Sequence, residues 1–85
     1  MRERVRSNGY VMTGHAFEEM EADDLTVFDV ERCILTGEIV DRQQDQRTGA
    51  WKCLVHGDAT DDSPMAVVVT LGPMGRAVIV TVFIL

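Results

Sequence analysis

The C-terminal part of the chain constrains the fold most, because it holds two strongly apolar runs separated by a short turn. The first run, residues 65–71, reads MAVVVTL, and the second, residues 76–85, reads RAVIVTVFIL. Both are rich in Val and Ile, whose branched side chains favour an extended backbone. Residues 72–75, Gly-Pro-Met-Gly, favour a sharp reversal. This pattern predicts a β-hairpin. Its strands are expected in the middle of a sheet, because neither run alternates polar with apolar residues.

A first amphipathic helix is predicted over residues 14–22. Thr13 is a suitable N-cap, because its side-chain oxygen can accept a hydrogen bond from the first turn. Ala16, Phe17 and Met20 fall on one side of the helix and form its expected apolar face.

A second helix is predicted over residues 27–36, and its start is better marked. Thr26 and Asp29 have the spacing of a capping box, in which each side chain binds the backbone N–H group of the other residue. Gly37 follows the last turn, where a residue in the left-handed conformation commonly closes a helix.

Three more strands are predicted, over residues 10–13, 38–42 and 50–56, which gives the order β-α-α-β-β-β-β. Consecutive strands joined by short loops pair antiparallel, and two short helices can cover only one face of a sheet. We therefore predict a single α+β domain over residues 1–85, in which two helices pack on one face of an antiparallel sheet. Residues 1–8 are polar, and we predict that they form an N-terminal arm or the edge of a first strand.

The alternation of side chains along the strands shows that the second face of this sheet is also apolar. In the last strand, one set is Val78, Val80, Val82 and Ile84, and the other is Ala77, Ile79, Phe83 and Leu85. At about 25 cal/mol per Å² of apolar surface, exposing either set to water forgoes several kcal/mol. We expect a second copy of the chain or a partner protein to cover this face. The alternative is that sheet twist and the residues before Tyr10 cover it.

The strand predicted over residues 50–56 places Trp51 on one face and Lys52 on the other. Trp51 is interpreted as a core or interface residue rather than a base-stacking platform, because no second aromatic residue lies beside it at strand spacing.

The charge balance argues against a generic nucleic-acid-binding protein. The net charge is −6, from 14 acidic and 8 basic residues, whereas non-specific affinity for nucleic acid depends on neutralising phosphates. The charges are unevenly spread, since Arg2, Arg4 and Arg6 precede an acidic cluster over residues 18–24. Either these clusters are ordinary solvated surface, or a local basic face persists on an acidic protein.

No cofactor, metal ion or membrane segment is predicted. Cys33 and Cys53 are isolated from each other in sequence and match neither a zinc framework nor a disulfide scaffold, so we expect reduced thiols in a cytoplasmic protein. Residues 58–62 resemble the first part of a calcium-binding loop. The rest of the motif is missing, because Ser63 replaces the required Gly and Val69 replaces the required Glu. No apolar stretch approaches the ~20 residues of a membrane helix, and no secretory signal is visible.

Several short motifs, taken in order, resemble a known family. They are His15-Ala16, Met20, Asp29-Val30, Gly37-Glu38-Ile39 and Val80-Thr81-Val82-Phe83. Together they are similar to a prokaryotic family of unknown function with a His-Ala…Gly-Glu-Ile…Ile-Thr-Val-Tyr pattern. That family looks related to the RelE-like and BrnT-like toxins, small endoribonucleases of toxin–antitoxin pairs. The resemblance implies a RelE-like domain, RNA as a possible substrate and an antitoxin-like partner.

The chain departs from this resemblance where the family carries basic residues, because Gly14, Glu19 and Asp23 stand there instead. Cleavage of the RelE type relies on basic groups to hold phosphate and stabilise developing charge. Two functions therefore stay open. One is an RNA-binding or RNA-cleaving toxin. The other is a protein that retains the fold without catalysis and acts as a protein-binding or homodimerisation module.

Three residues are candidates for the chemistry of an endoribonuclease. His15 is a titratable group that could serve as general acid or base, unless its ring only hydrogen-bonds a neighbouring strand and fixes the helix start. Lys52 could contact phosphate, and Arg76, at the start of the last strand, could join it, unless each is an ordinary surface residue. The resemblance supports Arg76, because the family tends to carry an Arg before its apolar strand. His56 lies about 13 Å along the strand from Lys52, too far for the two to act on one atom.

Overall fold

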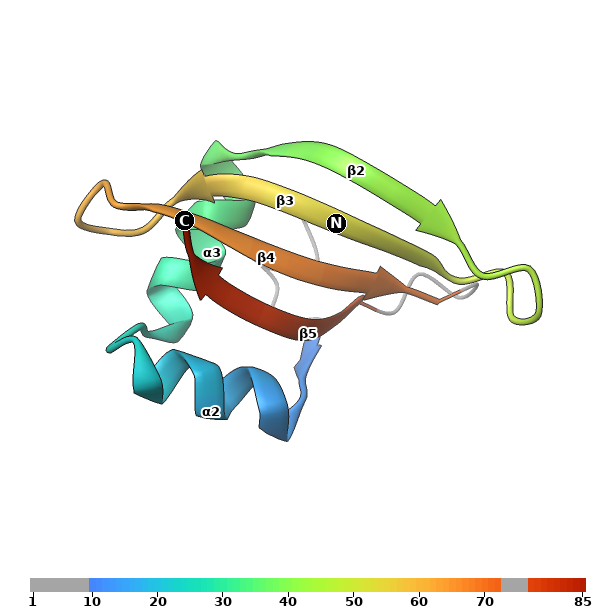
Figure 1. Cartoon of the computed structure of the whole chain (residues 1–85), viewed down its shortest axis with the longest axis horizontal. Helices are drawn as coiled ribbons and strands as arrows, with labels where there is room; N and C mark the ends of the chain where they lie inside the picture. Colours follow the sequence, from blue (N-terminus) through green and yellow to red (C-terminus); the bar gives the residue numbers. More distant parts are fainter. Residues whose placement is uncertain (1–9, 73–76) are drawn as a thin grey trace.

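The computed structural model describes residues 10–72 and 77–85. The elements are β1 (Tyr10–Met12), α2 (Gly14–Ala22), α3 (Val27–Thr36), β2 (Glu38–Gln44), β3 (Trp51–Asp58), β4 (Pro64–Leu71) and β5 (Ala77–Ile84). The predicted order of helices and strands is therefore confirmed, and the protein has an α+β fold (Figure 1).

The sheet has five strands in the order β1-β5-β4-β3-β2. Strands β2 to β5 form an antiparallel meander, and the predicted central position of the C-terminal hairpin is confirmed, since β5 lies between β1 and β4. The prediction of a wholly antiparallel sheet is wrong, because β1 pairs parallel with β5. Short turns impose antiparallel pairing only on strands that they connect, and β1 is followed by a helix.

Both helices begin as the sequence predicts. The Thr13 hydroxyl oxygen accepts from the Ala16 N–H at 3.1 Å. In the capping box of α3, the Thr26 N–H donates to Asp29 Oδ2 at 2.7 Å, and the Asp29 N–H donates to the Thr26 hydroxyl oxygen at 3.3 Å. These contacts depend on neighbours in sequence, which is why spacing alone revealed them.

Gly37 closes α3 for a reason other than the predicted one. Its φ of −89° and ψ of −179° are extended, so the expected left-handed conformation is wrong. A side chain is excluded there by packing, because an added Cβ would overlap the carbonyl oxygens of His56 and Cys33. Glycine at this position thus lets α3 run directly into β2 while lying against β3.

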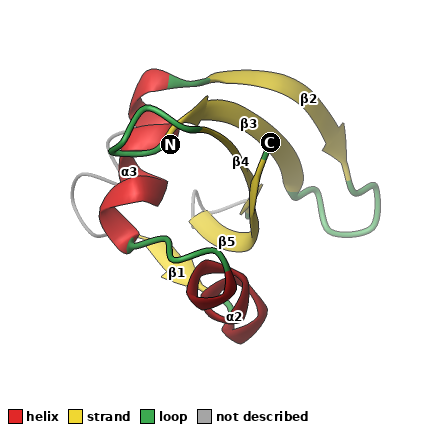
Figure 2. Ribbon diagram, turned by 60° about the vertical axis from the view of Figure 1, so that its left-hand side comes forward, coloured by secondary structure: helices red, strands yellow, loops and turns green. Residues whose placement is uncertain are grey.

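One hydrophobic core joins both helices to the same face of the sheet (Figure 2). Ala16 and Met20 of α2 share this core with residues of α3, β4 and β5. Phe17 was expected on the same apolar face, but its side chain is 49% exposed. It lies one residue beyond Ala16, so the turn of the helix directs it away from the sheet.

A β-bulge in β5 changes which residues face the core. Val68 pairs with Thr81 and Val69 with Ile79, which leaves Val80 as the extra residue. The predicted simple alternation along this strand is therefore wrong, because a bulge reverses the phase of the side chains that follow it. The core-facing residues are Ala77, Ile79 and Val82, all fully buried.

We call the opposite side of the sheet, turned away from both helices, the far face. Strand register places on it three residues each of β3, β4 and β5, namely Lys52, Leu54, His56, Ala66, Val68, Thr70, Val78, Thr81 and Phe83.

Candidate functional site

His15 lies in the first turn of α2, and its side chain is 66% exposed. Its Nε2 atom is 3.3 Å from Glu19 Oε1, one helical turn away. The same carboxylate oxygen accepts a hydrogen bond of 3.2 Å from the Val82 N–H of β5. Glu19 therefore makes the hydrogen bond that links α2 to β5, and His15 approaches the same carboxylate.

Thr13 and Glu19 cover part of one edge of the sheet. Strand β1 pairs with β5 only along Ala77 to Ile79. Beyond this point, the Thr13 hydroxyl group donates to the Val80 carbonyl oxygen at 3.3 Å, and Glu19 accepts from Val82. Sequence reasoning missed this role of Glu19, since nothing local shows which distant strand its carboxylate reaches.

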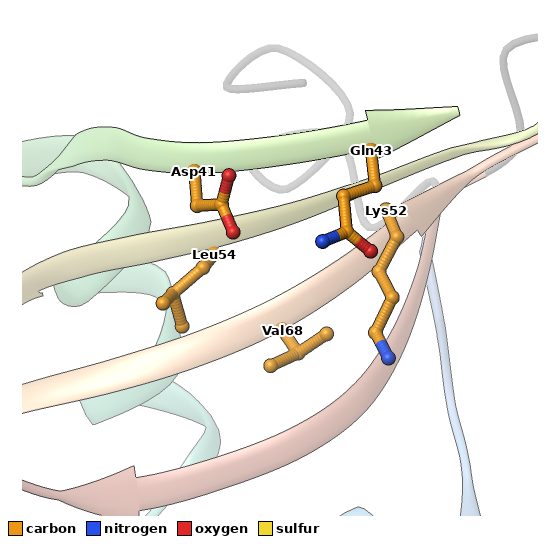
Figure 3. A pocket seen from close by; sticks show the side chains of 5 residues that line it. All are labelled: Asp41, Gln43, Lys52, Leu54 and Val68. Carbon is orange, nitrogen blue, oxygen red and sulfur yellow. The ribbon is translucent and has the colours of Figure 1, made fainter.

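Lys52 lies on the far face, in a pocket of about 190 Å³ between β2, β3 and β4 (Figure 3). Leu54 and Val68 supply apolar lining, and Asp41 and Gln43 supply polar groups from β2. The close-up shows the ammonium group of Lys52 turned away from the Asp41 carboxylate. The pocket is thus amphipathic, with one cation at its rim.

The structure does not bring His15 and Lys52 together. Helix α2 packs on the core face of the sheet, whereas Lys52 lines a pocket on the far face. Arg76, the third predicted residue, lies outside the described residues. The described residues therefore show two separate places, a His–Glu pair on α2 and an amphipathic pocket across the sheet.

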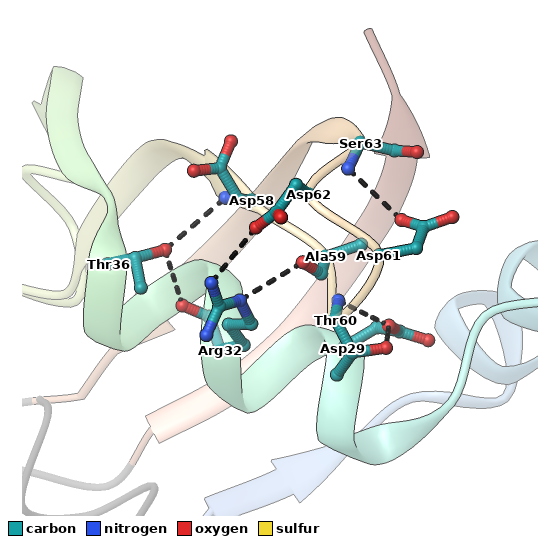
Figure 4. Close-up of polar contacts among 9 residues, drawn as sticks. All are labelled: Asp29, Arg32, Thr36, Asp58, Ala59, Thr60, Asp61, Asp62 and Ser63. Atoms are coloured by element: carbon teal, nitrogen blue, oxygen red, sulfur yellow. Dashed lines mark hydrogen bonds and ion pairs between the residues drawn. The ribbon is translucent and has the colours of Figure 1, made fainter.

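The acidic loop between β3 and β4 is fastened to α3 by its polar groups (Figure 4). Arg32 donates from Nε to the Ala59 carbonyl oxygen at 3.1 Å and from Nη2 to Asp62 Oδ1 at 3.0 Å. At the other end, the Asp58 N–H donates to the Thr36 hydroxyl oxygen at 3.3 Å. Among the loop carboxylates, Asp62 therefore contributes to holding the loop against α3.

Asp29 joins the start of α3 to the same loop. Its Oδ1 accepts from the N–H of Thr60 at 2.8 Å and from the hydroxyl group of Thr60 at 2.6 Å. Its Oδ2 accepts from the N–H of Thr26. Burial alone would raise the pKa of this carboxyl group, but the hydrogen bonds from Thr60 and Thr26 outweigh it and lower the pKa to about 2. Asp29 is therefore ionised and fully engaged at neutral pH.

The remaining titratable groups and thiols of the described residues form no further candidate site. Within residues 10–72 and 77–85, no His, Cys, Asp and Glu side chains gather in a group that could hold a metal ion. Cys33 and Cys53 are free and buried, and burial raises the pKa of the Cys33 thiol to about 11, which keeps it protonated. None of the helices in the described part of the chain is long and apolar enough to cross a membrane.

The helices are strongly acidic, whereas the β2–β3 hairpin carries charges of both signs. Among the described residues, α2, α3 and the turn between them carry seven carboxylates, Glu18, Glu19, Glu21, Asp23, Asp24, Asp29 and Glu31, with Arg32 as their basic residue. The other described basic residues, Arg42, Arg47 and Lys52, belong to the hairpin. The basic cluster at Arg2 to Arg6 lies outside the described residues.

The chain matches the model of a protein family described as a domain of unknown function, DUF4258, over residues 12–84. No curated protein and no solved structure matches the chain. Since the match spans most of the sequence, the protein belongs to the DUF4258 family. The predicted membership in a family of unknown function is confirmed at this level.

Proposed function

We propose that this DUF4258 protein is a toxin-like member of the RelE superfamily that acts as a non-catalytic module, associating with a second copy of itself through the far face. The observation that carries the proposal is the apolar surface of that face, which no helix among the described residues covers. Leu54, Val68 and Phe83 remain partly exposed on three adjacent strands, while both helices are committed to the opposite side.

The composition of the far face supports an interface. The central cross-strand row runs from Asp41 on β2 through Leu54 and Val68 to Thr81 on β5, so its apolar residues lie between polar ones. An apolar centre with a polar rim is the usual anatomy of a protein interface. Face-to-face packing of two such sheets would bury the apolar side chains of both copies.

Light scattering coupled to size exclusion tests this proposal at micromolar concentration. We expect a dimer for the wild type and a monomer for Val68→Lys, which places a charge at the centre of the far face. Phe28→Lys is the matched control, because Phe28 is 72% exposed on α3 and should leave the dimer intact. A clean monomer of the wild type overturns the proposal, as does a dimer that Val68→Lys leaves unchanged.

RNA cleavage is the second candidate function, and the contact between His15 and Glu19 favours it. A carboxylate at 3.3 Å from Nε2 can orient an imidazole ring for proton transfer. By resemblance, Lys52 and Arg76 would hold phosphate. If this function holds, concentrated protein cleaves RNA slowly, and His15→Ala and Arg76→Ala each lower the rate by about an order of magnitude or more. Absence of cleavage from any RNA tested, with harmless overexpression, excludes it.

A further inference from the structure

The outer edge of β2 is the least covered part of the described sheet. Every residue of Glu38–Gln44 is exposed, and β3 is the strand with which β2 pairs. Ile39 and Val40 are 47% and 45% exposed, and a hollow of about 380 Å³ runs beside them, bordered also by Asp41 and Arg42. An unpaired strand edge offers backbone N–H and C=O groups to another extended chain. At Arg42 the N–H donates to Asp41 Oδ1 at 2.9 Å, so an added strand would replace that acceptor and leave the carboxylate to bind a basic side chain.

The charges along β2 disfavour pairing of this edge with its own copy. Directly opposite residues of an antiparallel pair point to the same face, so a two-fold axis aligns like with like. An axis at Asp41 sets two carboxylates opposite each other, and an axis at Arg42 sets two guanidinium groups opposite each other. An axis at Gln43 brings Asp41 opposite Asp45, just beyond the strand. An axis at Val40 sets Glu38 opposite Arg42, but Val40 is the extra residue of a β-bulge in β2, so this register would oppose two bulges. Like charges directly opposite are destabilising, so a different sequence is the better occupant.

Arg42 and Trp51 form an anchor beside this edge, on the face that carries the helices. The Arg42 guanidinium group lies 5.9 Å from the centre of the Trp51 ring, and Trp51 is 40% exposed instead of belonging to the core. Trp and Arg are the residues most often found at energetic centres of interfaces. The ring holds the guanidinium group in place, ready for a carboxylate on an added strand.

We propose that the β2 edge binds an extended segment of another protein, which adds antiparallel as a sixth strand and carries an acidic residue immediately followed by a basic one. In this arrangement the acidic residue lies opposite Arg42 and the basic residue opposite Asp41. Strand addition extends the sheet sideways and leaves the apolar centre of the far face, around Val68, uncovered, although Asp41 lies on the same side of the sheet.

The order of the two charged residues provides a sharp test. The probe is a short peptide of alternating Thr and Val with a central Glu-Lys pair, and the control peptide has the same composition with Lys-Glu. Trp51 is the single tryptophan of the chain, so its fluorescence reports binding next to β2. We expect the Glu-Lys peptide to bind about threefold or more tightly than the Lys-Glu peptide.

A variant with exchanged charges, Asp41→Lys with Arg42→Glu, should prefer the Lys-Glu peptide. Both substitutions lie on an exposed strand, so they should leave the fold intact. Repeating the titration with Val68→Lys separates this site from self-association, because peptide binding should persist there. Equal binding of the two peptides, no binding of either, or unchanged preference in the exchanged variant overturns the proposal.

Discussion

The two edges of the sheet are finished in opposite ways. On one side, β1 covers the beginning of β5, and Thr13 and Glu19 satisfy backbone groups of β5 beyond it. On the other side, every residue of β2 is exposed, and the Arg42 N–H donates to a side chain of β2 itself, Asp41 Oδ1, at 2.9 Å. Proteins commonly protect edges against unwanted pairing, and the bulge and charges of β2 act in that way without closing it. The protein's own residues therefore cover the edge of the sheet beside β5. The edge at β2 carries features that disfavour pairing but stays accessible to another strand.

This comparison changes the interpretation of Glu19. In the sequence, this carboxylate stood out as a departure from a basic nuclease pattern. In the structure, it satisfies a backbone N–H group that β1 does not reach. An acidic or amide side chain is required for that contact, since Lys and Arg carry no acceptor.

The largest effect is expected at the glycine that begins the open edge. Gly37→Ala should lower the free energy of unfolding by about 3 kcal/mol, because the new methyl group meets fixed backbone of β3 and α3. Gly14→Ala, at the start of the helix that seals the other edge, is the control. Nothing lies within 4 Å of its added Cβ, so stability should be unchanged or slightly higher. Equal losses in urea denaturation would contradict this difference between the edges.

Asp29, which binds the loop between β3 and β4, lies at neither edge of the sheet and provides an internal reference for stability. The Asp29 carboxyl group has a folded pKa of about 2, below its ordinary value of 3.8. Its contribution to stability is therefore present above pH 4 and disappears as pH falls toward 2. The shift corresponds to about 2 kcal/mol. Asp29→Asn should remove this part of the acid sensitivity. Urea midpoints measured between neutral pH and pH 2 provide the check, and an unchanged pH slope in the variant would count against the assignment.

Opening the sealed edge should cost less. Glu19→Ala leaves the Val82 N–H without its side-chain acceptor and should reduce stability by about 1 kcal/mol, with faster hydrogen exchange at that amide. Glu18→Ala, an exposed neighbour on the same helix, should change stability by no more than about 0.5 kcal/mol. If the Val82 amide exchanges at the wild-type rate in Glu19→Ala, the sealing role is wrong.

The smallest effect is expected on the open edge itself. Arg42→Ala removes an exposed cation–π contact worth about 0.5 kcal/mol and should alter the fluorescence of Trp51. Arg47→Ala, at the hairpin tip, should leave that fluorescence unchanged. An equal spectral change in both variants would show that the contact between Arg42 and Trp51 is not specific.

Local contacts explain which parts of the fold the sequence could predict. Thr13, Thr26 and Asp29 act on residues three positions away, so their roles follow from spacing. The contact of Glu19 with Val82 spans 63 positions, and the parallel pairing of β1 with β5 joins the two ends of the described chain. No local pattern encodes such pairings. The sequence did not reveal the bulge at Val80 for another reason, because every residue around it is equally suited to a strand.

The same distinction applies to the candidate site. Residue chemistry identified His15 and Lys52 as groups able to move a proton or hold an anion. Their placement on different sides of the sheet depends on where α2 packs and on the register of β3, which single residues do not reveal.

The extra residue in β5 also fixes a spacing of core positions that can be compared between members of the family. Its core positions are spaced by two residues and then by three, at 77, 79 and 82. A family member lacking the insertion would have to place its third inward side chain one position earlier, or lose the docking of Thr13 on the carbonyl oxygen of Val80. Length variation inside this strand should consequently be rarer than in the neighbouring hairpin tips, a pattern that aligned sequences would show at once.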